Sequence, residues 1–242
     1  MDANSLGTTS RLALLIFSAY LFNRTYSPPA GTFTLPPLGP SFSEKREWFT
    51  LRLCTYVYPF LRIGYAAVTF LECLFTSMTY LKNPSSLADY PILRIPLGLS
   101  GPPGWIAMLG LLTSVFGGLF RISCYKALGD GFTFNITRSS SKLITSGPYS
   151  IVRHPAYLAL SLNSAGISIY HLSPGSWLRE SGLLQHNVCK AVVGAWIFII
   201  ITMNICLGFR AEDEDRLMKS MFEEEWEKWR RDVRYKIYPG LY

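Results

Sequence analysis

The chain has 242 residues, of which 49% are hydrophobic and only 16% are charged, and its formal net charge is +7. A soluble domain normally has about a quarter of its residues charged, so this composition argues against a soluble globular protein and indicates one membrane-embedded body. Much of the positive charge lies beside apolar runs, which favours anionic lipid over nucleic acid as a partner, and no nucleic-acid-binding motif occurs.

Cysteine and histidine are too scattered to indicate a metal site. The five cysteines lie in or beside apolar runs, none forms a CxxC pair, and only three histidines are present. A zinc site needs several thiolate or imidazole ligands at short spacing. We therefore expect the cysteines to be small buried hydrophobic residues, and we expect no metal.

Five apolar segments are candidates for crossing a bilayer. About 20 apolar residues span the hydrocarbon core, and about 17 suffice when charged side chains at the ends reach the headgroups. In chain order the segments are residues 12–23, 53–81, 104–120, 157–172 and 191–209. The first is short: a signal peptide is possible, but we favour a short span or anchor, and a proline-rich linker at 27–43 follows it. The sequence predicts an all-α integral membrane protein with about five transmembrane helices.

The distribution of basic residues predicts which side of the membrane each loop faces. Segments 121–153 and 210–236 are rich in lysine and arginine, whereas 82–103 holds only two basic residues. Because residues 157–209 would form a two-span hairpin, both basic segments lie on one side, which the positive-inside rule makes cytosolic. The C-terminus is therefore predicted to be cytosolic.

The tail after the last apolar segment has the pattern of an amphipathic helix. Between residues 217 and 233 apolar side chains recur at steps of three and four, which is the period of a helix face. We expect residues 211–238 to form a cytosolic surface helix on the membrane or on the spans, with Trp226 and Trp229 at the level of the lipid headgroups.

Two polar clusters beside the last two spans hold the candidate functional residues. Arg210 follows nineteen uncharged residues and lies four positions before Glu214. The two share a helix face, either as an ordinary ion pair or as part of a binding site. His154 precedes Pro155, which predicts that the fourth span begins at Pro155 or later. His154 and Tyr157 then frame the start of that span, where unpaired backbone N–H groups can bind a ligand.

Arg62 and Glu72 interrupt the second predicted span. Ten residues separate them, about 15 Å along a helix, which is too far for a direct ion pair. Ionisable residues inside a membrane are candidates for function. Each of these two either reaches the headgroups or pairs with another helix.

The residues of the two polar clusters together resemble the isoprenylcysteine carboxyl methyltransferase family. The shared pattern is LxTxGPYxxxRHPxY from Leu143 to Tyr157, then a hairpin, then RxEDE from Arg210. The resemblance covers residues 121–242 and implies a methyltransferase region there, after N-terminal helices and a linker in 1–120. Members are integral membrane enzymes, typically of the endoplasmic reticulum, that transfer a methyl group from S-adenosylmethionine to the C-terminal carboxylate of a prenylated cysteine. Prenylated protein C-termini and the lipid bilayer would then be the partners.

The resemblance also implies a role for individual residues. Arg210 would hold the substrate carboxylate and Glu214 the cofactor, and both would serve catalysis. The other cofactor contacts would be Ser141, Leu143, Ile144, Tyr149, His154, Pro155, Ala156 and Tyr157. The chain departs from the family at four positions: Ser141 replaces the usual His, Ala156 the usual Ser, Ala159 a common Gly, and Glu223 the Gly of a Phe-Gly pair often found in the tail.

Other functions remain open. A phospholipid amine methyltransferase would use the same cofactor in the same setting, but an amine substrate would favour a base and would not require Arg210. A non-catalytic membrane scaffold or prenylcysteine binder descended from the family is a further alternative. Nicotinamide-dependent sterol reductases have a related C-terminal pattern, but they usually carry more spans than this chain can supply.

Overall fold

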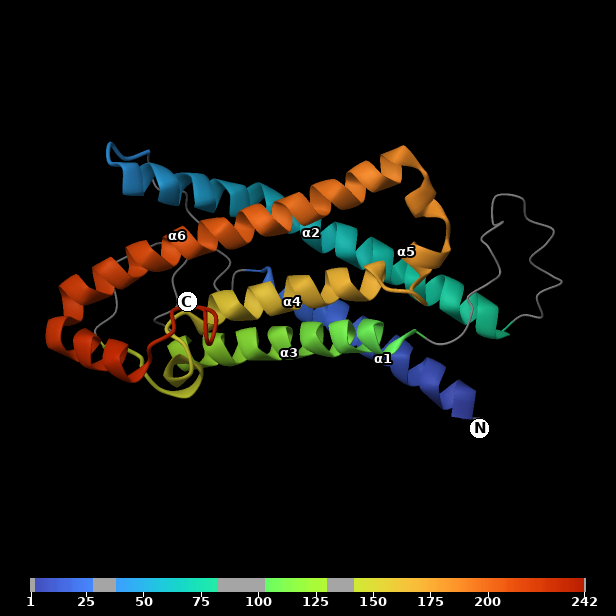
Figure 1. Ribbon diagram of the computed structural model, residues 1–242, viewed down its shortest axis with the longest axis horizontal. Helices are drawn as coiled ribbons and strands as arrows, with labels where there is room; N and C mark the ends of the chain where they lie inside the picture. Colours follow the sequence, from blue (N-terminus) through green and yellow to red (C-terminus); the bar gives the residue numbers. More distant parts are fainter. Residues whose placement is uncertain (1–2, 28–37, 82–102, 130–141, 242) are drawn as a thin grey trace. The chain divides into compact units, whose positions relative to one another are not determined.

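All regular structure in the described residues of the computed structural model is helical (Figure 1). The structure describes residues 3–27, 38–81, 103–129 and 142–241. The helices are α1 (Ala3–Thr25), α2 (Phe42–Leu81), α3 (Trp105–Leu128), α4 (Pro155–Leu172), the four-residue α5 (Trp177–Glu180) and α6 (Asn187–Asp232), with 3-10 turns η4 (Gly147–Ser150) and η5 (Leu183–Gln185). The predicted all-α class is confirmed.

Three helical segments of the described chain are long and apolar enough to cross a membrane: Glu44–Met78, Trp105–Leu128 and Asn187–Asp232. The chain is therefore a multi-pass membrane protein. α1 and α4 are not among the three. α4 has 18 residues, about 27 Å at 1.5 Å per residue, and several of them are polar. The predicted count of five spans stays a prediction.

The last apolar segment and the tail form one helix. α6 runs from Asn187 to Asp232 without a break at Arg210, so the prediction that a separate helix begins near residue 211 is wrong. The change from apolar to charged residues marks a change of surroundings, and it does not end a helix, because Ala, Glu and Arg are good helix formers. Arg210 and Glu214 consequently lie in the middle of a continuous helix.

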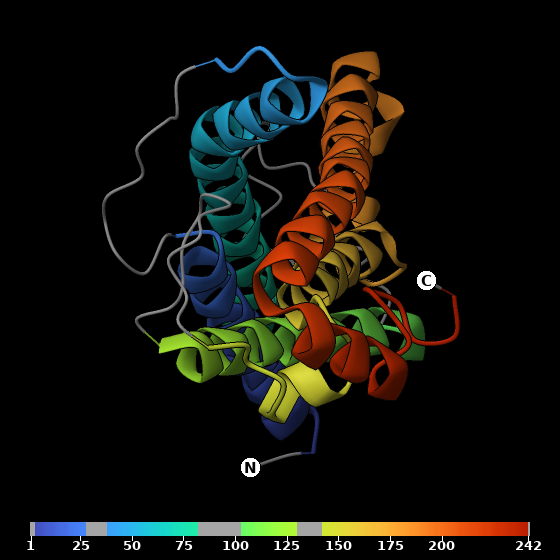
Figure 2. The same cartoon turned by 90° about the vertical axis from the view of Figure 1, so that its left-hand side faces the viewer.

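α6 bends sharply at Glu223, near its C-terminal end. Glu223 has φ +35° and ψ −99°, and it is the one described non-glycine residue with positive φ. Both views show the red end of α6 turning away from the long orange part (Figures 1 and 2). Positive φ is a glycine conformation, so the bend lies at the position where the resembled family often has Gly.

The chain divides into two compact units, each built from several separate segments. Unit 1 comprises Met1–Asn23, Leu61–Phe116 and Leu162–Ile199, and unit 2 comprises Arg24–Phe60, Gly117–Ser161 and Ile200–Tyr242. The two units are described separately below. The division at residue 120 that the sequence suggested stays a prediction.

In unit 1, α3 and α4 pack closely through small residues. A Cβ atom built on Gly166 would lie 2.5 Å from the backbone oxygen of Gly110, so neither position has room for a side chain. Beside this contact Asn163 Nδ2 donates to the Ser114 backbone oxygen at 2.8 Å, and Ser18 Oγ hydrogen-bonds Ser114 Oγ at 2.7 Å. Small residues and interhelical hydrogen bonds replace the hydrophobic effect where helices associate in lipid.

Unit 1 also holds a buried charged cluster centred on Glu72. The Glu72 side chain has no solvent exposure and pairs with Arg11 of α1. It accepts hydrogen bonds from Tyr170 Oη at 3.1 Å and from the Trp177 backbone N–H at 2.8 Å. Glu72, which the sequence left without a partner, thus joins α2 to α1, α4 and α5.

Unit 2 contains an aromatic cluster between the C-terminal part of α6 and the loop before α4. Its buried members are Cys124, Leu143, Tyr149, Trp226, Trp229 and Val233. Trp226 is 4% exposed and Trp229 is 7% exposed. The two indoles therefore pack inside unit 2, and their location at headgroup level stays a prediction. The bend in α6 allows this packing.

Candidate functional site

The loop before α4 carries the first polar cluster, and its backbone is shaped by glycine and proline. Gly147 begins the 3-10 turn η4 with φ +62°, a conformation that favours glycine. α4 begins at Pro155, as predicted, so His154 is the last residue before the helix. The His154 backbone oxygen accepts from the Tyr157 N–H at 3.1 Å, which places both side chains at the start of α4.

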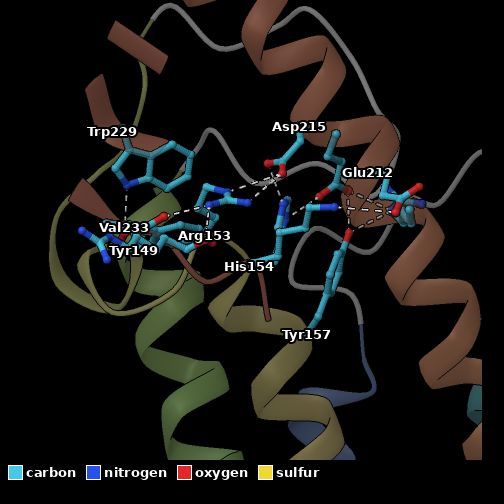
Figure 3. A network of polar contacts seen from close by, with 12 residues as sticks. Tyr149, Arg153, His154, Tyr157, Glu212, Asp215, Trp229 and Val233 are labelled. Atoms are coloured by element: carbon cyan, nitrogen blue, oxygen red, sulfur yellow. Dashed lines mark hydrogen bonds and ion pairs between the residues drawn. The ribbon is translucent and has the colours of Figure 1, made fainter. Parts of the chain in front are cut away.

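His154 lies between two carboxylates of α6 (Figure 3). Its Nδ1 is 3.3 Å from Glu214 Oε2, and its Nε2 is 3.0 Å from Asp215 Oδ1. The ring stacks on that of Tyr157, with centroids 5.6 Å apart and 5° between the planes. Because an acceptor faces each ring nitrogen, the arrangement suits the imidazolium form, in which both nitrogens donate.

The charges around His154 change its acidity. Burial by itself lowers the pKa of His154, because it disfavours the charged ring. The hydrogen bonds and negative charges of Asp215 and Glu214 outweigh burial, so the pKa of His154 is raised above its usual value of about 6.5. The two carboxylates thus favour the charged form of the buried His154 ring.

Arg210, Tyr157 and Glu214 form a connected triangle. Arg210 Nε donates to Tyr157 Oη at 3.0 Å and to Glu214 Oε1 at 2.9 Å, and Tyr157 Oη donates to the same Glu214 oxygen. Arg210 is 8% exposed, whereas the Glu214 side chain is 22% exposed. Glu214 therefore joins the guanidinium and phenol on one side to the imidazole of His154 on the other.

Arg153 connects the same loop to the end of the chain. Its Nη1 donates to the backbone oxygens of Val233 and Arg234, each at 2.8 Å. Its Nε and Nη2 face Asp215 Oδ2 at 3.4 Å. Arg153 is 5% exposed, and Asp215 and these carbonyl groups satisfy its buried charge.

Tyr149 lies in the aromatic cluster beside the charged residues. Trp229 Nε1 donates to the Tyr149 backbone oxygen at 3.0 Å (Figure 3). Burial raises the pKa of the Tyr149 phenol above its usual value, so the side chain is neutral near pH 7. Leu143 belongs to this cluster, and Ile144 and Ala156 pack against it. The Ala156 backbone oxygen accepts from Arg121 Nη1 at 2.8 Å.

The predicted site residues thus fall into two neighbouring groups. The charged group contains His154, Tyr157, Arg210 and Glu214. The apolar group contains Leu143, Ile144, Tyr149 and Ala156, and Pro155 is the buried first residue of α4. Ser141 lies outside the described residues. The ligand that each residue holds stays a prediction.

Asp215 and Trp229 contact the site, although the sequence did not identify either of them as a site residue. Arg153 and His154 are adjacent basic residues, and such a pair, once buried, needs a nearby counter-charge. Residues 212–215 offered four consecutive carboxylates, but only the rotation of α6 decides which of them faces the loop. Of these, Asp213 instead accepts both hydrogen bonds from Arg46 of α2, at 2.7 Å each.

Comparisons with known proteins find one matching family model and distant relatives. Residues 105–224 match the model of the phospholipid methyltransferase family. The chain is 25% identical over 198 residues to Delta(14)-sterol reductase ERG24A of Gibberella zeae, which covers 72% of this chain and 40% of the relative. It is 29% identical over 127 residues to a Delta(14)-sterol reductase of Neurospora crassa, covering 46% of this chain and 25% of the relative. The chain thus spans less than half the length of either relative.

No solved structure matches the chain. The segment that matches the methyltransferase model includes the whole His154–Glu214–Arg210 cluster. The chain is therefore a multi-pass membrane protein that contains, over residues 105–224, a domain similar to the phospholipid methyltransferase family and that is distantly similar to sterol reductases.

Proposed function

We propose that the protein transfers a methyl group from S-adenosylmethionine to the C-terminal carboxylate of a prenylated cysteine, at the cytosolic face of the endoplasmic reticulum membrane. The observation that carries the proposal is the triangle of Arg210, Tyr157 and Glu214. A guanidinium suited to a carboxylate lies 2.9 Å from an acid suited to the hydroxyl or amino groups of a cofactor.

The residues present fit this cofactor. The Glu214 side chain is 22% exposed, so one of its oxygens can accept from a ribose hydroxyl or an amine. Trp226 Nε1 is buried and has no hydrogen-bond partner among the described residues, and it belongs to the same cluster as Leu143 and Tyr149. An unpaired buried donor in aromatic surroundings suits a nitrogen acceptor of an adenine base.

The protein's own residues would act by binding and alignment. When bound, S-adenosylmethionine supplies an electrophilic methyl group on its sulfonium. The acceptor carboxylate is already ionised at neutral pH, so the reaction needs no general base. Arg210 would fork onto that carboxylate and turn one oxygen toward the methyl group. Correct alignment of two reactants can contribute roughly 7–11 kcal/mol to catalysis.

The membrane setting agrees with this substrate. A prenyl group is apolar and belongs in lipid, whereas the cysteine carboxylate is charged and belongs at the membrane surface. In α6, Arg210 directly follows an uncharged run of nineteen residues. A guanidinium at that position is suited to the boundary between the hydrocarbon region and the headgroups.

Methylation of a phospholipid amine is the second candidate, and the family match of residues 105–224 favours it. An amine is protonated near neutral pH and must lose a proton before it attacks, so this reaction would require a base. It would place a cation, not an anion, beside Arg210, which is electrostatically unfavourable. Sterol reduction is a third candidate, on the strength of the two sterol reductase relatives alone.

One set of assays separates these candidates. Purified full-length protein in lipid nanodiscs is given labelled S-adenosylmethionine with either a farnesylcysteine analogue or phosphatidylethanolamine. The proposal expects label on the farnesylcysteine analogue. Label on phosphatidylethanolamine alone would instead support the second candidate.

Titrations with S-adenosylmethionine and with NADPH complete the test. We expect binding of S-adenosylmethionine. Binding of NADPH alone would support a reductase, and binding of neither by folded protein would favour a non-catalytic scaffold.

A further inference from the structure

We propose that Asp215 is a positioning residue of this site, which holds the Arg153–His154 pair against α6 with the help of the C-terminal segment 233–236. None of the family features in the sequence pointed to Asp215. The proposal concerns the arrangement of the site, and only its ligand-affinity readout rests on the proposed function.

Asp215 binds both members of the pair with different oxygens. Its Oδ1 is 3.0 Å from His154 Nε2, and its Oδ2 is 3.4 Å from both Nε and Nη2 of Arg153 (Figure 3). Asp215 is 7% exposed, so solvent screens these charges little. One carboxylate thus contacts two adjacent basic side chains of the loop from a single turn of α6.

The C-terminal segment holds the same two residues through backbone hydrogen bonds. The Arg153 N–H donates to the Tyr235 oxygen at 3.0 Å, and the His154 N–H donates to the Lys236 oxygen at 2.8 Å. The Arg153 side chain adds hydrogen bonds to the oxygens of Val233 and Arg234. The bend of α6 brings this segment back toward the loop (Figure 2).

The position of Asp215 controls what Glu214 can do. His154 has one carboxylate at each ring nitrogen, Glu214 at Nδ1 and Asp215 at Nε2. Without the charge of Asp215, the imidazole would depend on Glu214 alone, and its plane would no longer be held parallel to the Tyr157 ring. Glu214 would then be drawn toward His154 and away from Arg210. Asp215 acts on the reacting groups only through these neighbours.

The test is Asp215→Asn in the full-length protein, which keeps the shape and removes the charge. The chain has three histidines, so histidine-selective isotope labelling with NMR can follow the protonation of each. We expect the titration midpoint of His154 to fall by about one to three pH units. We also expect S-adenosylmethionine affinity to weaken roughly tenfold, the loss of about one charge-assisted hydrogen bond.

The control is Asp232→Asn, which removes an exposed carboxylate at the last residue of the same helix. It should leave both the His154 midpoint and the affinity unchanged. Asp215→Glu keeps the charge and should keep the His154 midpoint high, so it serves as the test if Asp215→Asn does not fold.

An unchanged His154 midpoint in Asp215→Asn, or a midpoint near 6.5 in Asp215→Glu, would overturn the positioning role. The midpoint does not depend on turnover. Failure of the wild type to bind S-adenosylmethionine would therefore count against the proposed function and leave the positioning role to be judged by NMR.

Discussion

Arg210 Nε lies 2.9 Å from Glu214 Oε1, and both groups also contact the phenol of Tyr157. The residue expected to hold the acceptor acid is thus paired with the residue expected to hold the cofactor. The pair neutralises two charges that would otherwise be costly to bury. When ligands bind, contacts from Glu214 to the cofactor and from Arg210 to the acid must replace the ion pair. Binding of the cofactor at Glu214 should therefore favour binding of the acid at Arg210.

Replacing Arg210 with Ala should remove most of the turnover without removing cofactor binding. A hydrogen bond to a charged group contributes about 1.5–3 kcal/mol, so kcat/KM for a farnesylcysteine analogue should fall by roughly 10- to 150-fold. Steady-state kinetics measure the first quantity and calorimetry with S-adenosylmethionine the second. Arg216→Ala, at a side chain that is 65% exposed, should behave as wild type. Normal turnover by Arg210→Ala would refute the assigned role.

Tyr157→Phe should loosen the triangle while keeping the ring that stacks on His154. The lost hydroxyl donates to Glu214 and accepts from Arg210. We therefore expect a loss of about 1.4 kcal/mol, which is a roughly tenfold fall in cofactor affinity or in kcat/KM. Tyr235→Phe is the matched control, because the Tyr235 side chain is 41% exposed. Equal effects of the two substitutions would show that the Tyr157 hydroxyl has no special part.

His154 should make stability depend on pH in a defined direction. Its pKa is raised in the folded protein by Asp215 and Glu214, against the effect of burial. The stabilisation is therefore complete below the unfolded pKa of about 6.5 and is lost as pH rises through the folded pKa. The difference in melting temperature between wild type and His154→Gln should be largest in mild acid and should shrink at alkaline pH. A difference that grows with pH would contradict this assignment.

Glu72→Gln should destabilise unit 1. The substitution leaves Arg11 buried without its counter-charge, and breaking a buried pair costs about 3–5 kcal/mol. Thermal unfolding in detergent should reveal a clear drop in melting temperature. Glu225→Gln, at an exposed position of α6, should change it little. A melting temperature that is unaffected by Glu72→Gln would show that the cluster is not an important contributor to stability.

Glu223→Gly should stabilise the protein, because it removes a side chain from a position with φ +35°. A non-glycine residue in such a conformation costs about 1–2 kcal/mol. Glu224→Gly is the matched control one residue later: that position is helical, so glycine should cost up to about 1 kcal/mol there. Opposite shifts in melting temperature are expected, and a loss of stability in both variants would argue against strain at Glu223.

The helices could largely be predicted from hydropathy, because each apolar run is a local feature. Pro155 also marked the start of α4, since proline constrains the residue before it. The predicted break near residue 211 was wrong because charge was taken as a sign of a helix end. The bend lies instead at Glu223, at the position where the resembled family often has Gly.

The site was predicted in part. His154, Tyr157, Arg210 and Glu214 stood out by their positions at the ends of apolar runs, and the structure brings them together. Asp215 did not stand out, because the three residues before it are also acidic. Only the rotation of α6 decides which of these four carboxylates faces the loop. Arg62 was recognised as an unusual charge within a span, but its partner, Asn23 Oδ1 at 2.6 Å, lies 39 residues away.

The sequence alone determined that the chain is helical and embedded in a membrane, and that two polar clusters border its last long apolar segments. These properties depend on hydropathy and on the spacing of neighbouring residues, which act over a few turns of helix. The tertiary structure decided which charges meet. Tyr157 and Glu214 are 57 residues apart, and His154 and Asp215 are 61 residues apart. Such contacts depend on how whole helices pack and rotate, and no local pattern specifies that.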